Sequence, residues 1–154
     1  MDIFEYFDFE TNDIEMKLME LNNNYSTWSR GRTFDRVKLI CDSIVGHLKK
    51  QQHLLLDNLT PSPELNAFMQ ECQKDRTKVD DEIGQLVMVH VDEPAYNEYL
   101  LHLLKVIEEH IRYSREFYQK VRSLASKQDI TNVNCKLMDM VLHSSDYNAI
   151  QPHS

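Results

Sequence analysis

Apolar side chains recur along this chain every three or four residues, the spacing that gathers them on one face of an α-helix. Four long segments carry this pattern, and we expect helices over about residues 11–28, 34–57, 64–90 and 95–126. Each stripe is broad, which is typical of a helix packed inside a bundle. A weaker amphipathic stretch over 135–142 predicts a short fifth helix. We expect the last residues, 144–154, to be loose.

Short polar segments separate the expected helices. Ser29 to Thr33 interrupts the pattern, and we expect Thr33 to be the N-cap of the second helix. Before the third helix, Ser62 followed by Pro63 is the usual order of an N-cap and a first helical residue. Long amphipathic helices with short connections predict an all-α, up-down-up-down antiparallel four-helix bundle. We assign residues 1–126 to this bundle and residues 127–154 to a C-terminal short helix and tail, packed on the bundle or trailing from it.

Composition agrees with a helical chain and narrows the partners. Only three Gly and four Pro occur in 154 residues, whereas an all-β chain needs many Gly- and Pro-containing turns. The net charge of −8 repels the phosphate backbone, so nucleic acid is not an expected partner. No apolar run reaches the roughly 18–20 residues that span a bilayer, so we expect no membrane association. The three cysteines, odd in number and without a CxxC, favour a reducing, cytoplasmic location.

Five polar residues stand in the apolar stripes where core residues are expected. They are His47 and Gln51 in the second segment, Asp75 in the third, and His110 and Ser114 in the fourth. His47, Asp75 and His110 each lie within about two residues of the midpoint of their segment, or about 3 Å along the helix axis. Side chains from three helices should therefore meet at one level of the core. Buried together, they must bind one another, water or an ion.

Two His and one carboxylate form a competent ligand set for a divalent transition metal ion. One hypothesis is therefore a mononuclear Fe, Mn or Zn site with His47, Asp75 and His110 as ligands. The alternative is a hydrogen-bonded polar cluster with ordered water and no metal. The chain has no GxSxG, no Gly-rich phosphate loop and no HExxH, so we assign no catalytic residue and do not expect an enzyme.

In helix order, helix lengths and the placement of these polar residues, positions 1–124 resemble the hemerythrin-like, or HHE cation-binding, family. This family is an antiparallel four-helix bundle with a non-haem di-iron site in its middle. The second-helix motif of the family, His-x-x-x-Glu, falls on His47 and Gln51. The third-helix motif, His-x-x-x-His, falls on Asp75 and Val79. The resemblance thus implies one kept ligand, one replaced bridging acid, one carboxylate in place of His and one position that cannot ligate.

The other two helices of the family depart from the pattern as well. On the fourth helix, His110 is kept, and Arg115 stands where the family has an acid five residues later. The first-helix His falls most simply on Ile14, with Asp13 beside it. The Arg115 side chain is long enough either to face the core or to reach solvent. With both bridging carboxylates replaced, we expect no standard di-iron, oxygen-carrying centre.

Three functional readings follow. The leading one is a divergent cytoplasmic hemerythrin-like protein whose di-iron site is lost or reduced, with a sensing, binding or interaction role rather than oxygen carriage. The second is the mononuclear metal protein. The third is an interaction module, as a homodimer, that uses a face of the bundle and the aromatic residues near the N-terminus, Phe4 and Phe7 among them. The sequence identifies no small-molecule or protein partner.

Overall fold

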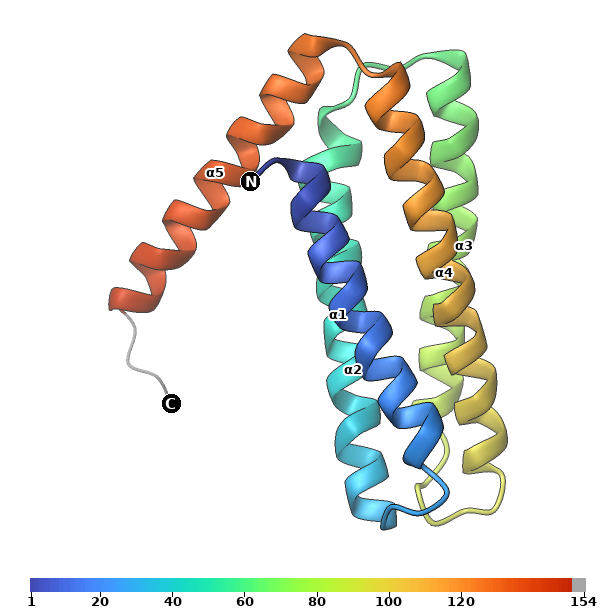
Figure 1. The fold of residues 1–154 in the computed structure, drawn as a ribbon. Coiled ribbons are helices and arrows are strands. Elements are labelled where there is room, and N and C mark those ends of the chain that lie inside the picture. The colour runs from blue at the N-terminus through green and yellow to red at the C-terminus, as the bar shows by residue number, and fades with distance from the viewer. Residues whose placement is uncertain (151–154) are drawn as a thin grey trace.

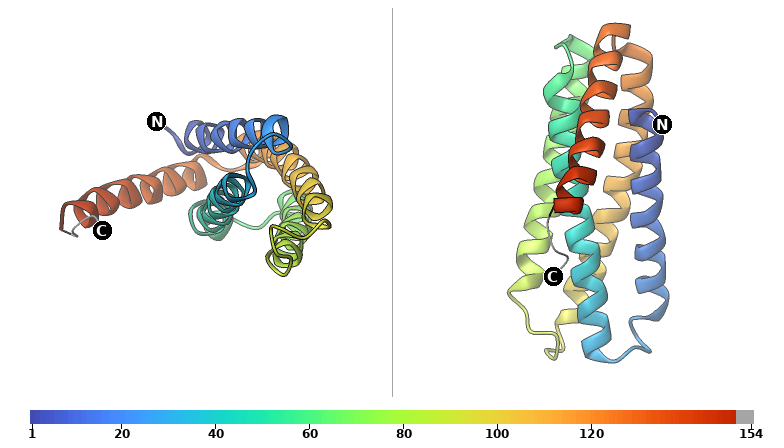
Figure 2. Two further views of the ribbon diagram at one scale, coloured as in Figure 1. Left: turned by 90° about the horizontal axis from the view of Figure 1, so that it is seen from below. Right: turned by 90° about the vertical axis from the view of Figure 1, so that its left-hand side faces the viewer.

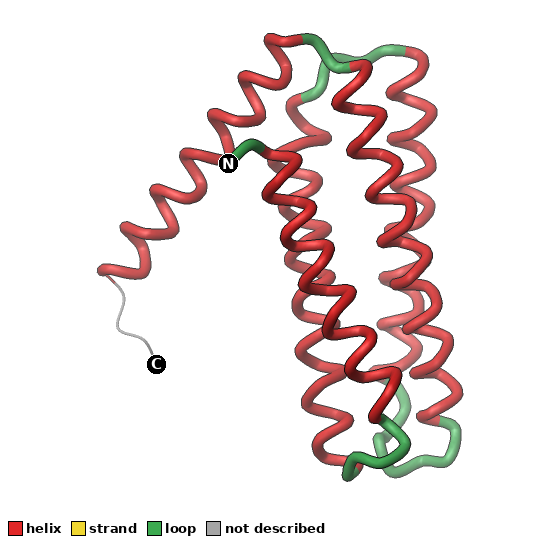
Figure 3. Tube along the Cα trace, in the orientation of Figure 1, coloured by secondary structure: helices red, strands yellow, loops and turns green. Residues whose placement is uncertain are grey.

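The computed structural model describes the backbone of residues 1–150 and the side chains of residues 1–143. Over the described backbone the protein is all-helical and contains no strand, as Figure 3 shows. The predicted all-α class is therefore confirmed. None of the described helices is both long enough and apolar enough to cross a membrane.

Four long helices form the body of the molecule: α1 (Ile3–Asn24), α2 (Arg30–Lys50), α3 (Pro63–Val87) and α4 (Tyr96–Leu124). They alternate in direction and run alongside one another, as expected of an antiparallel four-helix bundle (Figure 1). Helix α1 packs against α2 and α4, and α3 packs against α4. Figure 2 shows the same arrangement from below and from the side.

Helix α1 begins earlier than the predicted residue 11. The side chain of Asp2 accepts a hydrogen bond from the backbone N–H of Glu5 at 2.8 Å, which caps the helix at Ile3. The aromatic residues before position 11 therefore belong to the helix. Phe4 and Phe7 are buried in the core, so they do not form the dimer surface suggested by the sequence.

Helix α2 also begins before the expected position. Ser29, and not Thr33, is its N-cap, because the Ser29 hydroxyl accepts a hydrogen bond from the N–H of Arg32 at 3.2 Å. Thr33 lies one turn inside the helix and is buried. Beyond Lys50 the helix continues as a π-helical segment over Gln51–Leu55 and a 3₁₀ turn over Leu56–Asn58.

The starts of α3 and α4 agree closely with the sequence patterns. The Ser62 hydroxyl caps α3 by accepting a hydrogen bond from the N–H of Leu65 at 3.2 Å, and Pro63 is the first helical residue. Helix α4 spans Tyr96–Leu124, close to the predicted 95–126. A stripe of buried residues from Leu100 to Val121 runs along it.

The apolar core falls into two clusters along the bundle axis. One is built around Leu18, Ile44 and Leu103, and the other around Phe7 and Phe117. Between these apolar levels each long helix contributes polar side chains. This polar level is where the candidate site lies.

The fifth helix is longer than the predicted 135–142. Helix α5 spans Lys127–Ile150, so the backbone expected to be loose from residue 144 is helical as far as Ile150, and residues 151–154 lie outside the described residues. Val133 and Leu137 are buried against the apolar cluster built around Phe7 and Phe117. Figures 1 and 2 show the rest of α5 leaning away from the other helices.

Candidate functional site

Three helices bring the two histidines and the central carboxylate together in the core. His47 on α2, Asp75 on α3 and His110 on α4 are all buried. The centroids of the two imidazole rings are 6.2 Å apart, with the rings nearly perpendicular. An oxygen of Asp75 contacts Nδ1 of His110. The polar level expected from the helix midpoints is therefore present.

Each nitrogen of His47 has a defined partner. Nδ1 lies 3.1 Å from Oε1 of Glu10 on α1, and Nε2 lies 3.0 Å from the hydroxyl of Tyr118 on α4. A carboxylate only accepts hydrogen bonds, so Nδ1 carries the proton and Nε2 accepts the phenol hydrogen. The ammonium of Lys50 lies 2.5 Å from the other oxygen of Glu10. This assignment leaves His47 neutral, with both of its ring nitrogens hydrogen-bonded.

The electrostatics agree with a neutral His47 beside a charged Glu10. Burial lowers the pKa of His47 and outweighs the hydrogen bond with Glu10, which raises it. Burial by itself would raise the pKa of Glu10, but hydrogen bonds with His47 and Lys50 reverse this and lower it. The half-buried negative charge of Glu10 is therefore compensated by Lys50, at the edge of the core.

His110 repeats the arrangement of His47 with other residues. Its Nδ1 is held by the carboxylate of Asp75, and its Nε2 lies 3.2 Å from the hydroxyl of Ser114, one turn further along α4. Both imidazoles are thus anchored through Nδ1 by a carboxylate, and each presents Nε2 to a hydroxyl group. Asp75 therefore contacts Nδ1 of His110 and not Nε2, which faces Ser114.

Tyr118 joins the two halves of the cluster. Its buried ring stacks on Phe7 with centroids 5.1 Å apart, and Nε2 of Gln51 donates to its hydroxyl oxygen at 3.0 Å. Burial raises the pKa of Tyr118 strongly, and hydrogen bonds with Gln51 and Ser114 oppose that effect. The phenol therefore stays protonated and stands between His47 and the Ser114–His110 pair.

Three further residues that the family motifs single out lie outside this cluster. Val79 and Ile14 are buried in the apolar core. Asp13 is on the surface, where its carboxylate pairs with Lys17 at 2.7 Å. None of the three contributes a donor atom to the cluster.

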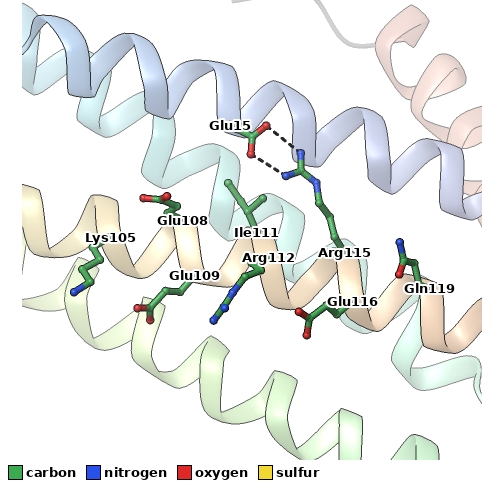
Figure 4. A pocket seen from close by; sticks show the side chains of 9 residues that line it. All are labelled: Glu15, Lys105, Glu108, Glu109, Ile111, Arg112, Arg115, Glu116 and Gln119. Atoms are coloured by element: carbon green, nitrogen blue, oxygen red, sulfur yellow. Dashed lines mark hydrogen bonds and ion pairs between the residues drawn. The ribbon is translucent and has the colours of Figure 1, made fainter.

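Arg115 lies on the surface side of α4, which answers the question the sequence left open. Its guanidinium donates to both oxygens of Glu15, at 2.8 and 3.1 Å, and to the Asn12 side chain at 2.8 Å. Figure 4 shows Arg115 reaching across to Glu15 on α1, beside an outer groove of about 570 Å³. The Arg115 guanidinium therefore forms an ion pair at the surface and does not lie in the polar core.

Sequence reasoning missed two members of the cluster, Glu10 and Tyr118. A signal for Tyr118 exists, because it follows Ser114 by four residues and His110 by eight, on the same face of α4. Glu10 follows the buried Phe7 by three residues, but it lies before the predicted start of the first helix. A correct helix start would have placed it on the inner edge of α1.

Three observations bear on whether the cluster can hold an ion. Among the residues described, no group of three or more His, Cys, Asp or Glu side chains is arranged to hold a metal. The hydroxyl of Thr11, one turn beyond Phe7 on the same face of α1, is buried and has no hydrogen-bond partner within the described part of the chain. A groove of about 260 Å³ between α1 and α2 is lined by Glu10, His47 and Lys50 and reaches the cluster from outside.

Comparison of the chain with models of known protein families, with curated proteins and with solved structures gives no match.

Proposed function

We propose that this protein is a divergent hemerythrin-like protein whose two-metal centre is reduced to a single-ion site between His47 and His110. Its role is then sensing or binding, and not oxygen carriage. The observation that carries the proposal is that both imidazoles are anchored through Nδ1 by a carboxylate, Glu10 or Asp75. Metal-bound His residues typically have this arrangement, in which the second nitrogen is held and the first is free to ligate.

The residues do not fit a pair of ions. The amide of Gln51 is hydrogen-bonded to Tyr118, and Arg115 is paired with Glu15 at the surface. Neither position offers a carboxylate that could bridge two metals. The positive charge of two ions would therefore be poorly balanced in this core.

The same residues fit one ion better. Metal–nitrogen bonds of about 2.1 Å place the centroids of two imidazoles on one ion at most roughly 6.4 Å apart. The ring centroids of His47 and His110 are 6.2 Å apart, which is within this limit. The α1–α2 groove at Glu10 and Lys50 supplies a route of entry. A bound ion would supply Lewis-acid or redox chemistry at this buried position.

Metal analysis of the purified full chain tests the proposal. The protein is loaded without air with Fe(II), Mn(II) or Zn(II), and bound metal is measured after removal of free ions. We expect about one equivalent of at least one metal, and we expect His47→Ala or His110→Ala to abolish binding. His102→Ala is the matched control, because this His is on α4 but 72% exposed.

Three results contradict the single-ion site. About two equivalents of bound metal would indicate a two-metal centre. The absence of any bound metal would indicate that the site is a hydrogen-bonded cluster without an ion. Equal binding by wild type and His110→Ala would show that the ion lies elsewhere.

A second candidate function is a homodimeric interaction module, and one observation favours it. Cys135, Met138 and Leu142 recur at steps of three and four on α5, and all three are exposed, Met138 and Leu142 by 57% and 56%. Val133 and Leu137 on the same helix face the core. An apolar stripe on the outer face of a helix that is already packed on its inner face is typical of an interaction surface. The association state in solution tests this candidate.

A further inference from the structure

The α1–α2 groove connects the surface of the protein with one of the two imidazoles of the core. It has a volume of about 260 Å³, and His47, which is only 3% exposed, lines it together with Glu10 and Lys50. Its lining also includes the exposed carboxylates of Asp13 on α1 and Asp42 on α2. An ion in this groove therefore passes carboxylates before it reaches His47.

Gly46 lies next to His47 in the lining of this groove. It stands in the interior of α2, where glycine weakens a helix relative to alanine. Close packing does not require the glycine, because a Cβ added there meets nothing within 4 Å beyond its own stretch of helix. A larger side chain would enter the groove, where Phe9 and Ile14 on α1 offer it an apolar wall. The glycine thus keeps the groove open beside His47.

The charges of the α1–α2 groove favour the entry of a cation. Glu10 pairs with Lys50 at 2.5 Å and Asp13 pairs with Lys17 at 2.7 Å, whereas Asp42 has no ion-pair partner among the described residues. The carboxylates of the groove and their partners therefore retain one net negative charge. Negative charge along a cleft raises the local concentration of cations and speeds up their binding.

A second groove reaches the cluster from the other side of α1, and its charges differ. It has a volume of about 320 Å³, Tyr118 is part of its lining, and Arg115 and Arg122 line it together with Asp8. When Glu15, the partner of Arg115, is included, the charges cancel. A metal cation on this path would pass two guanidinium groups, so the α1–α2 groove is the better route of entry.

We propose that Gly46 controls how fast a metal ion enters and leaves the core, because it keeps the α1–α2 groove open beside His47. This inference rests on the proposed single-ion site and assigns Gly46 a role in the rate of metal exchange, not in the affinity of the site. A side chain in the groove hinders entry and exit alike. Both rates then fall by the same factor, and their ratio, the dissociation constant, stays constant.

The kinetics of metal exchange test this role. The full chain is mixed with the metal that the wild type binds among Fe(II), Mn(II) and Zn(II), and bound metal is measured over time. Release is then followed after addition of excess chelator. In Gly46→Leu we expect both rates to fall by at least about tenfold, with about one equivalent still bound at equilibrium. Gly46→Ala, which adds a single methyl group, should slow both rates less.

The matched control for added bulk is Gly84→Leu. Gly84 is an exposed glycine of α3 that does not line the groove, and a Cβ added there also meets nothing within 4 Å. Both rates should equal those of the wild type.

A second variant tests the groove without added bulk. Asp42→Asn keeps the size of the side chain and removes one negative charge, so loading with a divalent ion should slow about two- to threefold at low salt. High salt should abolish the difference. Asp8→Asn makes the same change in the second groove and should load at the rate of the wild type.

The outcomes separate this inference from the single-ion proposal. Unchanged rates in a folded Gly46→Leu variant overturn the role of Gly46, and unchanged loading of Asp42→Asn at low salt overturns this route of entry; both leave the single-ion site standing. Faster release with weaker binding would show that position 46 acts on the site itself, which also overturns the inference. No bound metal in the wild type overturns the single-ion proposal and the role of Gly46 with it. Circular dichroism shows whether each variant keeps its helices, and if Gly46→Leu loses them, Gly46→Ala and Asp42→Asn decide.

Discussion

The chemical character of the core depends on which nitrogen of each histidine is held. In His47 and His110 a carboxylate holds Nδ1, so in both residues Nε2 faces a hydroxyl group. The reverse tautomers would leave a carboxylate facing a lone pair, with no hydrogen between them. Glu10 and Asp75 therefore determine what the imidazoles can bind, although the sequence motifs treat one as a ligand and omit the other.

The burial of neutral His47 makes the stability of the metal-free protein depend on pH. Because the pKa of His47 is lowered in the folded state, the unfolded chain binds a proton more readily below about pH 6.5. The free energy of unfolding should then fall as the pH drops below 6.5, by up to about 1.4 kcal/mol per pH unit until the folded-state pKa is passed. Urea unfolding of His47→Gln between pH 5 and 7 should show a shallower dependence than the wild type.

The control for this experiment is His53→Gln, because His53 is 75% exposed. Its pH dependence should equal that of the wild type. Equal slopes for wild type and His47→Gln would mean that His47 does not titrate with unfolding in this range, and the neutral assignment would be wrong.

The sequence predicts which residues are central to the site better than it predicts their hydrogen-bond partners. His47, Asp75 and His110 stand out because they interrupt apolar stripes, and stripe positions report burial directly. Hydrogen-bond partners follow from side-chain geometry, which a stripe does not report. Tyr118 follows the buried Phe117, and its hydroxyl is a central hydrogen-bonding group of the cluster.

At the scale of the helices, capping residues explain the differences between the expected and observed boundaries. The Asp2 side chain starts α1 at Ile3, and the Ser29 side chain starts α2 at Arg30. Helix periodicity predicts the middle of a helix well and its ends poorly, because a cap is a single local hydrogen bond. The π-helical turn at Gln51–Leu55 has no signature in the apolar pattern, yet it contains the amide that bonds to Tyr118.

Helix α5 is attached to the bundle by a buried carboxylate. Asp129 accepts hydrogen bonds from the backbone N–H and the hydroxyl of Thr60, at 2.8 and 2.9 Å, and is almost fully buried. Asp129→Ala leaves both donors without this acceptor and should cost about 2–3 kcal/mol of stability. Hydrogen exchange should become faster in α5 than in α4. Asp139→Ala, at an exposed position of the same helix, should leave exchange unchanged; similar protection in both variants would show that apolar contacts alone hold α5.

At the scale of the whole molecule, α5 has two apolar faces but only one of them is covered. The bundle covers Val133 and Leu137, whereas Met138 and Leu142 are exposed. Figures 1 and 2 show α5 leaning away from the other helices. A helix of 24 residues is about 36 Å long, which is enough to pair with a second copy along much of its length. The net charge of −8 opposes self-association at low salt.

We therefore expect a dimer that forms through the outer face of α5 and strengthens as salt rises, because salt screens the repulsion between two acidic copies. Sedimentation over a range of protein concentrations should show a shift from monomer to dimer. The double variant Met138→Lys with Leu142→Lys places charges on the stripe and should weaken the association by at least about tenfold, or about 1.4 kcal/mol. Met16→Lys is the matched control, because Met16 is 71% exposed on α1. A chain that stays monomeric at high concentration and high salt would contradict the proposed interaction module. An unchanged dimer in the double variant would show that the interface lies on another face.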